Sequence, residues 1–308
     1  MTTKQIIFVP GKNPKPEAEP HRELLWRALQ EGVRRADGPA AVAFDADYGQ
    51  FHLAAWNTLY YSETKDITVD IPWVDALVNK HGPTEQDIEE AASWNAKVGY
   101  FLLALADDIP ALIPFLPEEV GSTAREIERY FSNVDGIAVV VRDVLKQVLL
   151  PMMARGDDIL LIGHSLGAVI AYDTLWELSH RDDVKGRVDF LSLGTPMGLR
   201  YIQHRLLGMN HSEPHSYPTL IRRWVNVAAE GDVTALNRTM KWAFRDMAEQ
   251  GLVDSIEDHC HGIYNFFRSE AGLNSHRSYG YLVNPAVGNI IAEWWMPQDA
   301  GLATSASS

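Results

Sequence analysis

The sequence predicts a mostly parallel, doubly wound α/β sheet that carries a helical insertion. Short apolar runs with the length of buried strands alternate with longer stretches of helical periodicity, as expected for an α/β protein. The apolar run at residues 159–162 leads directly into a glycine-flanked turn and a helix, as in a strand-to-helix connection. Before it lies a segment of about a hundred residues, too long for a plain crossover, and this length predicts the insertion.

Composition narrows the class of protein. The chain has 308 residues, with 27 Lys and Arg against 41 Asp and Glu and a formal net charge of -14. Such an acidic chain disfavours nucleic acid and anionic membrane surfaces as partners. Its single cysteine, Cys260, excludes an intrachain disulfide, and no apolar stretch approaches the roughly 20 residues of a membrane span. We therefore expect one cytoplasmic catalytic domain without stable membrane insertion, and the oligomeric state stays open.

The first part of the chain predicts the start of the sheet. Residues 5–9 have the pattern of a strand, which Pro10 and Gly11 end in a turn. Residues 19–35 predict an amphipathic helix, and residues 40–44 predict a second strand. We assign this part to the core of the domain, which comprises residues 1–48 and 134–296.

Residues 49–133 are assigned to a helical insertion that caps the sheet edge. They contain apolar stretches of helical type at residues 51–61, 85–106, 111–116 and 123–131. A further helix, from residue 135 or 136 to residue 153, is expected to be the crossover that leads into the strand at 159–162. The tail at residues 297–308 is rich in Ala, Ser and Thr and is expected to be disordered.

The turn after the strand at 159–162 has the sequence Gly163-His164-Ser165-Leu166-Gly167. A strand-to-helix turn this sharp holds Ser165 in a strained conformation, and side chains at positions 163 and 167 would collide with neighbouring backbone. The serine hydroxyl is thereby held out above the sheet edge. The helix that follows presents its N-terminus there, so the backbone N–H of Leu166 is free to bind a developing negative charge.

These residues resemble the nucleophile elbow of the α/β-hydrolase superfamily, whose serine esterases and lipases carry G-x-S-x-G between a strand and a helix. The resemblance extends over residues 4–48 and 134–296 and implies an α/β-hydrolase fold. A predicted strand at 188–193 ends in a Gly-Thr-Pro turn at 194–198, similar to the corresponding strand in intracellular esterases and in the lipase-like GPI inositol-deacylases.

The resemblance also implies where the partners of Ser165 lie. The predicted strand at 222–229 exits through Glu230-Gly231-Asp232-Val233-Thr234, which resembles the Asp-x-Val turn that carries the catalytic acid. A last strand is predicted at 258–267, followed by His276 in a Tyr- and Gly-rich turn and by a helix at 285–295, as in the resembling families. The order Ser165, Asp232, His276 is the one that this fold produces.

Serine is a poor nucleophile at neutral pH, so it needs an imidazole to take its proton and a carboxylate to orient that imidazole. Ser165, His276 and Asp232 supply these groups at the ends of predicted strands. Plainer interpretations stay open: a turn serine, a histidine of a surface loop, and a turn or cap aspartate. The other acids before His276 precede the last predicted strand and should start from the opposite sheet edge; they are Asp254, Glu257 and Asp258.

In the resembling lipases and esterases, the loop after the first strand supplies a second oxyanion-binding N–H, and this position corresponds to Lys12. Pro10 stands where those proteins have histidine. The alternative is an ordinary turn at the end of a strand.

These observations together predict a serine hydrolase that cleaves short to medium acyl or aryl carboxylic esters through an acyl-enzyme. Amide, thioester or C–C bond hydrolysis on the same fold is one alternative, and a catalytically silent binding protein is another. No cofactor is expected, and no metal, because His259-Cys260-His261 lacks the further ligands of a structural site. The residues expected to line the substrate pocket are Tyr48, Trp94, Tyr100 and Met197.

Overall fold

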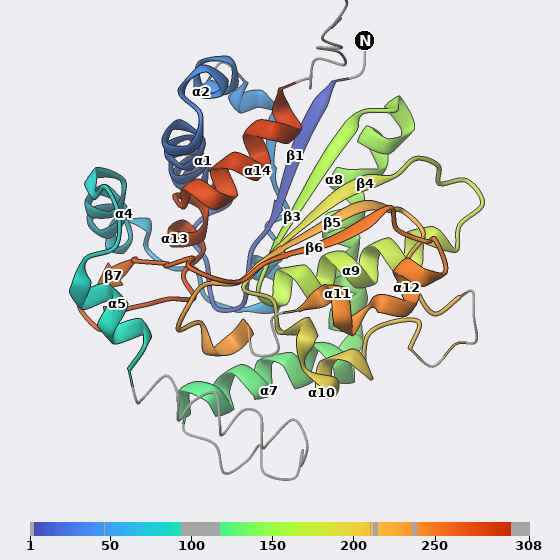
Figure 1. Ribbon diagram of the computed structural model, residues 1–308. Coiled ribbons are helices and arrows are strands. Elements are labelled where there is room, and N and C mark those ends of the chain that lie inside the picture. The colour runs from blue at the N-terminus through green and yellow to red at the C-terminus, as the bar shows by residue number, and fades with distance from the viewer. Residues whose placement is uncertain are drawn as a thin grey trace, which may run out of the picture.

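The structure of the protein is a computed structural model that describes residues 3–45, 47–93, 118–209, 211, 215–235 and 239–296, with backbone only at 118–124. Its centre is a six-stranded sheet in the order β2-β1-β3-β4-β5-β6, in which every neighbouring pair is parallel (Figure 1). The strands are β1 (Lys4–Val9), β2 (Phe51–Leu53), β3 (Asp158–His164), β4 (Val188–Leu193), β5 (Ile221–Val227) and β6 (Ser255–His259). The predicted α/β class with a mostly parallel sheet is confirmed.

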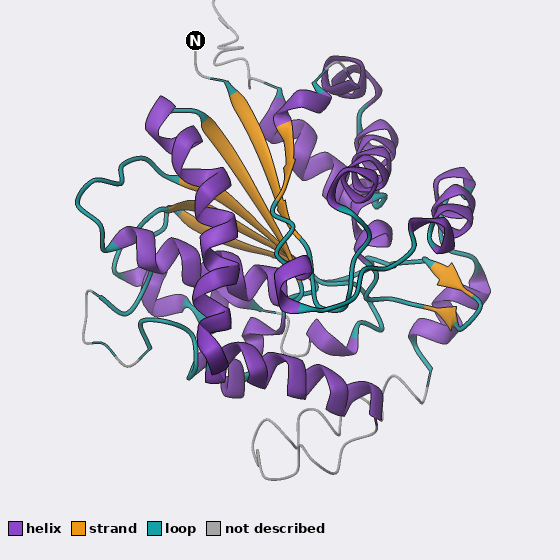
Figure 2. Ribbon diagram, turned by 180° about the vertical axis from the view of Figure 1, so that it is seen from behind, coloured by secondary structure: helices purple, strands orange, loops and turns teal. Residues whose placement is uncertain are grey.

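Helices cover both faces of the sheet. One layer contains α1 (Ala18–Ala36), α2 (Gly38–Asp45), α13 (Ser278–Leu282) and α14 (Pro285–Trp295). The other layer, seen from behind in Figure 2, contains α8 (Ile137–Arg155), α9 (Leu166–Ser179), α10 (Arg200–Gln203), α11 (Met240–Ala243) and α12 (Arg245–Glu249). Because both faces are covered, β3 and β4 are buried along almost their whole length, and β3 has a continuous apolar run at residues 159–162.

The first layer is closed by helices from the two ends of the chain. In Figure 1, α14 lies across α1. A Cβ atom added at Gly288 of α14 would lie 1.9 Å from the carbonyl oxygen of Gly32 in α1. The two helices therefore approach backbone to backbone, which only glycine permits at this crossing.

The direction of the chain across the sheet changes next to β1. The connection from β1 to β2 passes through α1 on one face, whereas the connection from β3 to β4 passes through α9 on the other face. In open parallel sheets, ligands bind outside the carboxyl ends of the strands at such a switch point. The topology alone therefore directs attention to the ends of β1 and β3.

The prediction of a strand at residues 40–44 is wrong, because these residues belong to α2. Asp37 caps this helix by accepting the N–H of Ala40 with its side chain at 3.0 Å, and the alanine-rich sequence after Pro39 favours a helix. The second strand is β2 instead, where Phe51 pairs with Ile6. It lies inside the range 49–133, at residues that the sequence predicted as helical.

The described part of this range is mainly helical. It contains the 3-10 turns Tyr48–Gln50 and Ile67–Val69 and the helices α3 (Asn57–Tyr60), α4 (Ile71–Asn79), α5 (Glu85–Ala91) and α7 (Glu118–Ser132). The predicted helix at 123–131 lies within α7. The predicted helix at 85–106 begins as α5, which ends at Ala91 and is followed by a turn at residues 92–93; residues 94–106 and the predicted helix at 111–116 lie outside the described residues.

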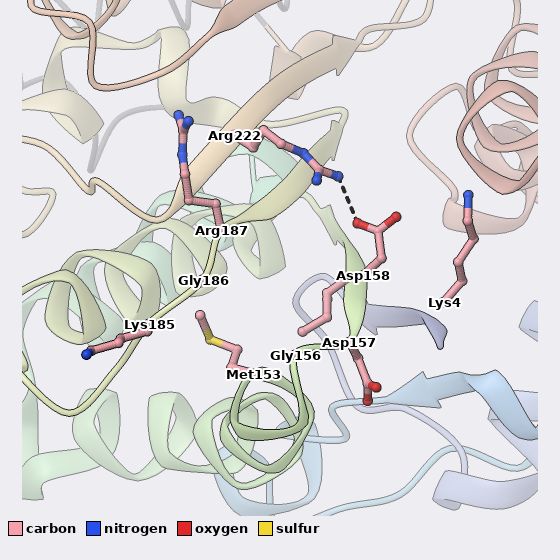
Figure 3. A pocket seen from close by; sticks show the side chains of 10 residues that line it. Lys4, Met153, Gly156, Asp157, Asp158, Lys185, Gly186, Arg187 and Arg222 are labelled. Atoms are coloured by element: carbon pink, nitrogen blue, oxygen red, sulfur yellow. Dashed lines mark hydrogen bonds and ion pairs between the residues drawn. The ribbon is translucent and has the colours of Figure 1, made fainter. Parts of the chain in front are cut away.

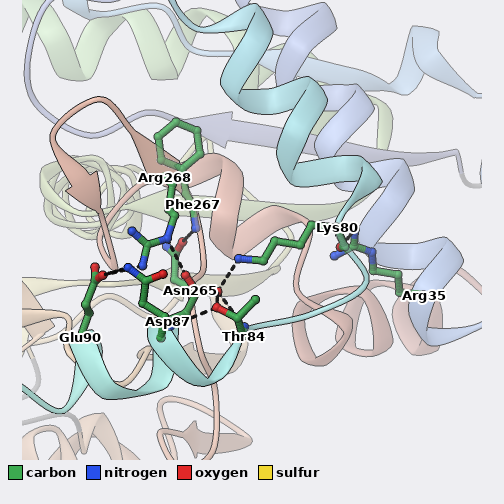
Figure 4. Close-up of polar contacts among 9 residues, drawn as sticks. Arg35, Lys80, Thr84, Asp87, Glu90, Asn265, Phe267 and Arg268 are labelled. Carbon is green, nitrogen blue, oxygen red and sulfur yellow. Dashed lines mark hydrogen bonds and ion pairs between the residues drawn. The ribbon is translucent and has the colours of Figure 1, made fainter.

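A buried carboxylate fastens α5 to the segment that follows the sheet (Figure 4). Asp87 is 1% exposed and accepts hydrogen bonds from Thr84 N at 2.7 Å, from Arg268 Nε at 2.7 Å and from Lys80 Nζ. Burial opposes the charge, but these hydrogen bonds lower the pKa of Asp87 to about 2. Arg268 begins the small hairpin β7 (Arg268–Ser269) and β8 (Gly272–Leu273). The hydrogen bonds of Asp87 therefore connect α5 to the chain just before His276.

The last strand of the sheet is β6, which ends at His259, so the prediction of a strand over 258–267 is shifted toward the C-terminus. Residues after His259 leave the sheet and run through buried aromatic side chains, Phe266 and Phe267, toward β7. Their apolar pattern comes from packing under α1 and α13 and not from strand pairing.

Candidate active site

Ser165 occupies a strained turn at the carboxyl end of β3. Its backbone has φ 55° and ψ −127°, a region that side chains rarely adopt. A Cβ at Gly163 would lie 2.5 Å from Ala168 Cα, and one at Gly167 would lie 2.2 Å from the carbonyl oxygen of Val9. The two glycines therefore let the turn pack directly against α9 and β1. Ser165 N–H donates to the carbonyl oxygen of Leu193 at 3.0 Å, which fixes the turn to β4.

The structure brings Ser165, His276 and Asp232 into one hydrogen-bonded array. The distance from His276 Nε2 to Ser165 Oγ is 2.9 Å. His276 Nδ1 lies 2.9 Å from Asp232 Oδ2 and 3.0 Å from Asp232 Oδ1. Ser165 is 2% exposed and Asp232 is 1% exposed, so the array is shielded from bulk water. In this arrangement His276 can take the proton of Ser165 while Asp232 holds the ring.

The carboxylate of Asp232 is held by neighbours that sequence reasoning did not identify. It follows β5 by a short turn and accepts hydrogen bonds from Tyr281 O–H at 2.5 Å and from Thr234 N–H at 3.0 Å. Tyr281 itself accepts from Ala229 N–H at 2.9 Å, which links α13 to the end of β5. A tyrosine four residues before the predicted helix at 285–295 gives no sequence signal for this contact.

The other acids are engaged elsewhere. Asp254 pairs with Arg187 at 2.7 Å before β6 begins, and Glu257 accepts two hydrogen bonds from Arg223 at 2.9 Å. Asp258 accepts the N–H groups of Met240 and Lys241 at 2.8 and 2.9 Å and so holds the start of α11. Asp232 is the acid that reaches His276.

The backbone of His276 is fixed by the histidine inside the elbow. His164 Nε2 lies 2.7 Å from the carbonyl oxygen of His276, so this nitrogen carries the proton and donates. Burial, and next the neighbouring His276, hold the pKa of His164 well below its usual range, so the ring is neutral. Asn274 supports the same segment by accepting His276 N–H at 3.1 Å. His164 thus holds the loop that carries His276 through its hydrogen bond to the His276 carbonyl oxygen.

Two backbone N–H groups lie beside Ser165. Leu166 is the first residue of α9, so its N–H has no intrahelical acceptor. Lys12 follows Gly11, and a Cβ at Gly11 would lie 2.9 Å from Ser165 Cβ, so the loop after β1 lies directly against the serine. No described residue accepts the N–H of Lys12 or of Leu166. Both N–H groups are therefore without an acceptor among the described residues and lie close to Ser165.

The surroundings of this loop are positively charged although the chain is acidic. Lys15 Nζ donates to the carbonyl oxygen of Lys12 at 2.8 Å. Lys65 and Arg277 both pair with Asp70, each at 2.6 Å. Burial lowers the pKa of Lys15 to about 7, and Arg277 adds to the effect more than Asp70 opposes it. The carbonyl oxygen of Lys12 is thus held by a buried lysine whose charged form is disfavoured by burial and by Arg277.

The residues predicted to line the pocket have different outcomes. Met197 is fully buried in the 3-10 turn Pro196–Gly198, just beyond the carboxyl end of β4 and so on the side of the sheet where Ser165 lies. Tyr48 precedes β2 at the opposite edge of the sheet, where its hydroxyl donates to Glu19 at 2.8 Å. The structure therefore does not bring Tyr48 to the site. Trp94 and Tyr100 lie outside the described residues.

A hollow of about 420 Å³ lies at the other end of the strands, near Asp158 at the start of β3 (Figure 3). Arg222 reaches across it to Asp158 at 2.8 Å and also pairs with Asp189 at 2.6 Å. These charges are satisfied by one another. The hollow is separated from Ser165 by the length of β3 and is not part of the candidate site.

No group of three or more His, Cys, Asp or Glu side chains that could hold a metal occurs within the described ranges. Cys260 is buried, while His259 and His261 beside it are exposed. In the part of the chain that the structure describes, no helix has both the length and the apolar character needed to cross a membrane.

Searches against models of protein families, curated proteins and solved structures find no match for this chain. The geometry around Ser165 is therefore the basis for assigning a function.

Proposed function

We propose that the protein is a serine hydrolase that cleaves carboxylic esters through an acyl-enzyme. The observation that carries this proposal is the continuous hydrogen-bonded array Ser165–His276–Asp232, with 2.9 Å from Ser165 Oγ to His276 Nε2 and 2.9 Å from His276 Nδ1 to Asp232 Oδ2. This is the order of groups that activates a serine hydroxyl. The α/β fold with Ser165 after a parallel strand is compatible with an α/β-hydrolase.

In the first half-reaction, Ser165 Oγ attacks the ester carbonyl carbon while His276 Nε2 takes the serine proton. The carbonyl oxygen becomes an oxyanion held by the N–H groups of Lys12 and Leu166, and each such donor contributes about 10²- to 10³-fold to kcat. His276 then gives its proton to the leaving alkoxide, and the alcohol departs. The acyl group stays on Ser165 Oγ.

In the second half-reaction, water replaces the alcohol. His276 takes a proton from the water, whose oxygen attacks the acyl carbonyl carbon and forms a second oxyanion at the same N–H groups. The intermediate collapses, His276 returns the proton to Ser165 Oγ, and the carboxylic acid leaves. Asp232 keeps His276 in the tautomer that carries hydrogen on Nδ1 and stabilises the imidazolium in both halves.

A fluorophosphonate probe tests the proposal, because it labels only an activated serine. We expect the wild-type chain to be labelled, the Ser165→Ala variant to be unlabelled and inactive on a p-nitrophenyl ester, and both to unfold at similar temperatures. Ser132→Ala, an exposed serine at the end of α7, is the matched control and should label normally. Unchanged hydrolysis by Ser165→Ala would sink the assignment.

The substrate is proposed to be an ester of a short to medium acyl or aryl group, because the helices between β2 and β3 in the chain would limit the space over Ser165. We expect a butyrate ester to have a higher kcat/KM than a palmitate ester, and the reverse order would refute the size limit. An amide and a thioester of the best acyl group, tested in the same series, identify the bond that the enzyme prefers.

A further inference from the structure

The loop after β1 is held from outside the sheet by the start of α3. Trp56 Nε1 donates to the carbonyl oxygen of Pro10 at 2.8 Å. Asn57 Nδ2 donates to the carbonyl oxygens of Gly11 at 2.8 Å and Asn13 at 3.0 Å. With Lys15 on the carbonyl oxygen of Lys12, each carbonyl of residues 10–13 has a side-chain donor.

The contact from Asn57 to Gly11 determines where the N–H of Lys12 points. In a trans peptide, the C=O of one residue and the N–H of the next are on opposite sides. Asn57 donates to the C=O of Gly11 from the side of the peptide that faces α3. The N–H of Lys12 therefore points away from α3. Ser165 is next to this peptide, because a Cβ at Gly11 would be 2.9 Å from Ser165 Cβ.

We infer that Asn57 is a positioning residue that aims the Lys12 N–H at the oxyanion formed on Ser165. The inference rests on the proposed function and goes beyond it, because it makes the first helix of the range 49–133 a fixed part of the catalytic machinery. Asn57 touches neither substrate nor Ser165 and acts through the Gly11–Lys12 peptide.

The chemistry of the asparagine supports this role. Two carbonyl oxygens at hydrogen-bond distance require the NH₂ end of the amide to face the loop, because a carboxylate or an amide oxygen would repel both. Asn57 is 2% exposed, and its Oδ1 is buried without a donor among the described residues. An apolar side chain there would leave the carbonyl oxygens of Gly11 and Asn13 without their side-chain donor, so a role in packing alone does not account for asparagine.

The helix that carries Asn57 is itself anchored. Tyr60 is 2% exposed, and its O–H donates to the carbonyl oxygen of Glu126 in α7 at 2.8 Å. Arg129 Nη1 donates to the carbonyl oxygen of Tyr60 at 2.6 Å. Asn13 N–H donates to the O–H oxygen of Tyr61 at 2.8 Å, which adds another contact between this helix and the loop. The donor of Asn57 is therefore presented from a rigid support.

The test compares Asn57→Ala and Asn57→Asp with wild type in ester hydrolysis. We expect kcat to fall on the order of 10- to 100-fold in Asn57→Ala while KM stays within about threefold, because the Lys12 N–H meets negative charge only in the transition state. Asn57→Asp keeps the size of the side chain but cannot donate, so it should lose at least as much. Asn79→Ala is the matched control, since Asn79 donates to a carbonyl of α4 at 2.8 Å away from Ser165.

A trifluoromethyl ketone inhibitor distinguishes positioning from a merely structural effect, because its adduct with Ser165 carries an oxyanion. Its Ki should rise in Asn57→Ala by the same factor as kcat/KM falls, while the Ki of the carboxylic acid product stays unchanged. The inference is overturned if kcat falls without weaker binding of the ketone. It is also overturned if both variants keep the wild-type kcat, or if neither variant folds. A wild-type enzyme that neither labels nor turns over overturns the proposed function as well, whereas an active wild type with an equally active Asn57→Ala overturns this inference alone.

Discussion

The carboxylate of Asp232 is fixed in position and in plane before any substrate binds. Tyr281 O–H and Thr234 N–H occupy lone pairs that do not face His276, at 2.5 and 3.0 Å. The remaining lone pairs face His276 Nδ1. Because the carboxylate cannot rotate without breaking these hydrogen bonds, the imidazole ring is held in one orientation and in one tautomer.

This geometry predicts a large effect of an isosteric change. Asp232→Asn should keep the fold yet lower kcat by about 10⁴-fold, because an amide stabilises the wrong imidazole tautomer and cannot balance the imidazolium. Asp254→Asn and Asp258→Asn, whose carboxylates face Arg187 and the start of α11, should each cost far less. The measurement is kcat of the three variants on one ester, with circular dichroism to show that each is folded. If Asp232→Asn stays within roughly tenfold of wild type, about 1.4 kcal/mol of barrier, Asp232 is not the orienting acid.

The sequence predicted the members of the array but not the residues that hold them. Ser165, Asp232 and His276 were found because each lies just after a strand or in a turn of distinctive composition. Asn57 and Tyr281 gave no such signal, because their roles depend on contacts with residues far away in the chain: Asn57 with Gly11 and Tyr281 with Asp232. Supporting contacts of this kind follow from the fold and are not written in any local pattern.

At the scale of elements, a buried acid joins three helical segments on the second face of the sheet. Asp173 of α9 is 1% exposed and accepts Tyr130 O–H of α7 at 2.9 Å and the N–H of Leu207, beyond α10, at 2.9 Å. Arg142 of α8 donates to the same Tyr130 oxygen at 3.2 Å. The docking of α7 against α9 is therefore linked to the protonation of Asp173.

Burial raises the pKa of Asp173 to about 7 from the ordinary value of 3.8. Between about pH 4 and pH 7 the folded protein therefore binds a proton that the unfolded chain releases, and this group makes the free energy of unfolding decrease as pH rises through that window. Asp173→Asn removes the titration. We expect the variant to gain stability relative to wild type on going from pH 5 to pH 8, by at least about 1 kcal/mol.

Urea unfolding of both proteins at the two pH values measures this shift. Asp143→Asn, which removes an exposed carboxylate of α8 that pairs with Lys146, is the control and should change little between pH 5 and pH 8. Equal differences between Asp173→Asn and wild type at both pH values would show that Asp173 does not titrate in this range.

For the whole molecule, the sequence predicted the central strands and failed at the edges. β1, β3, β4 and β5 are buried on both faces, and burial leaves an apolar run that is visible in the sequence. β2 has three residues and pairs with β1 only, so Phe51–Leu53 carries no pattern of its own. The apolar residues of α2 and those at 263–267 resembled strands because both segments pack against the same helical layer.

The backbone contact between α1 and α14 has a consequence for synthesis of the chain. During translation α1 is made long before Gly288 and the rest of α14. Until then the part of α1 that packs against α14 has no cover, and the segments with His276 and Tyr281 have not emerged either. The first helical layer of the nascent protein therefore stays incomplete and exposed to aggregation until α14 is made, and the candidate site is incomplete until His276 and Tyr281 have emerged.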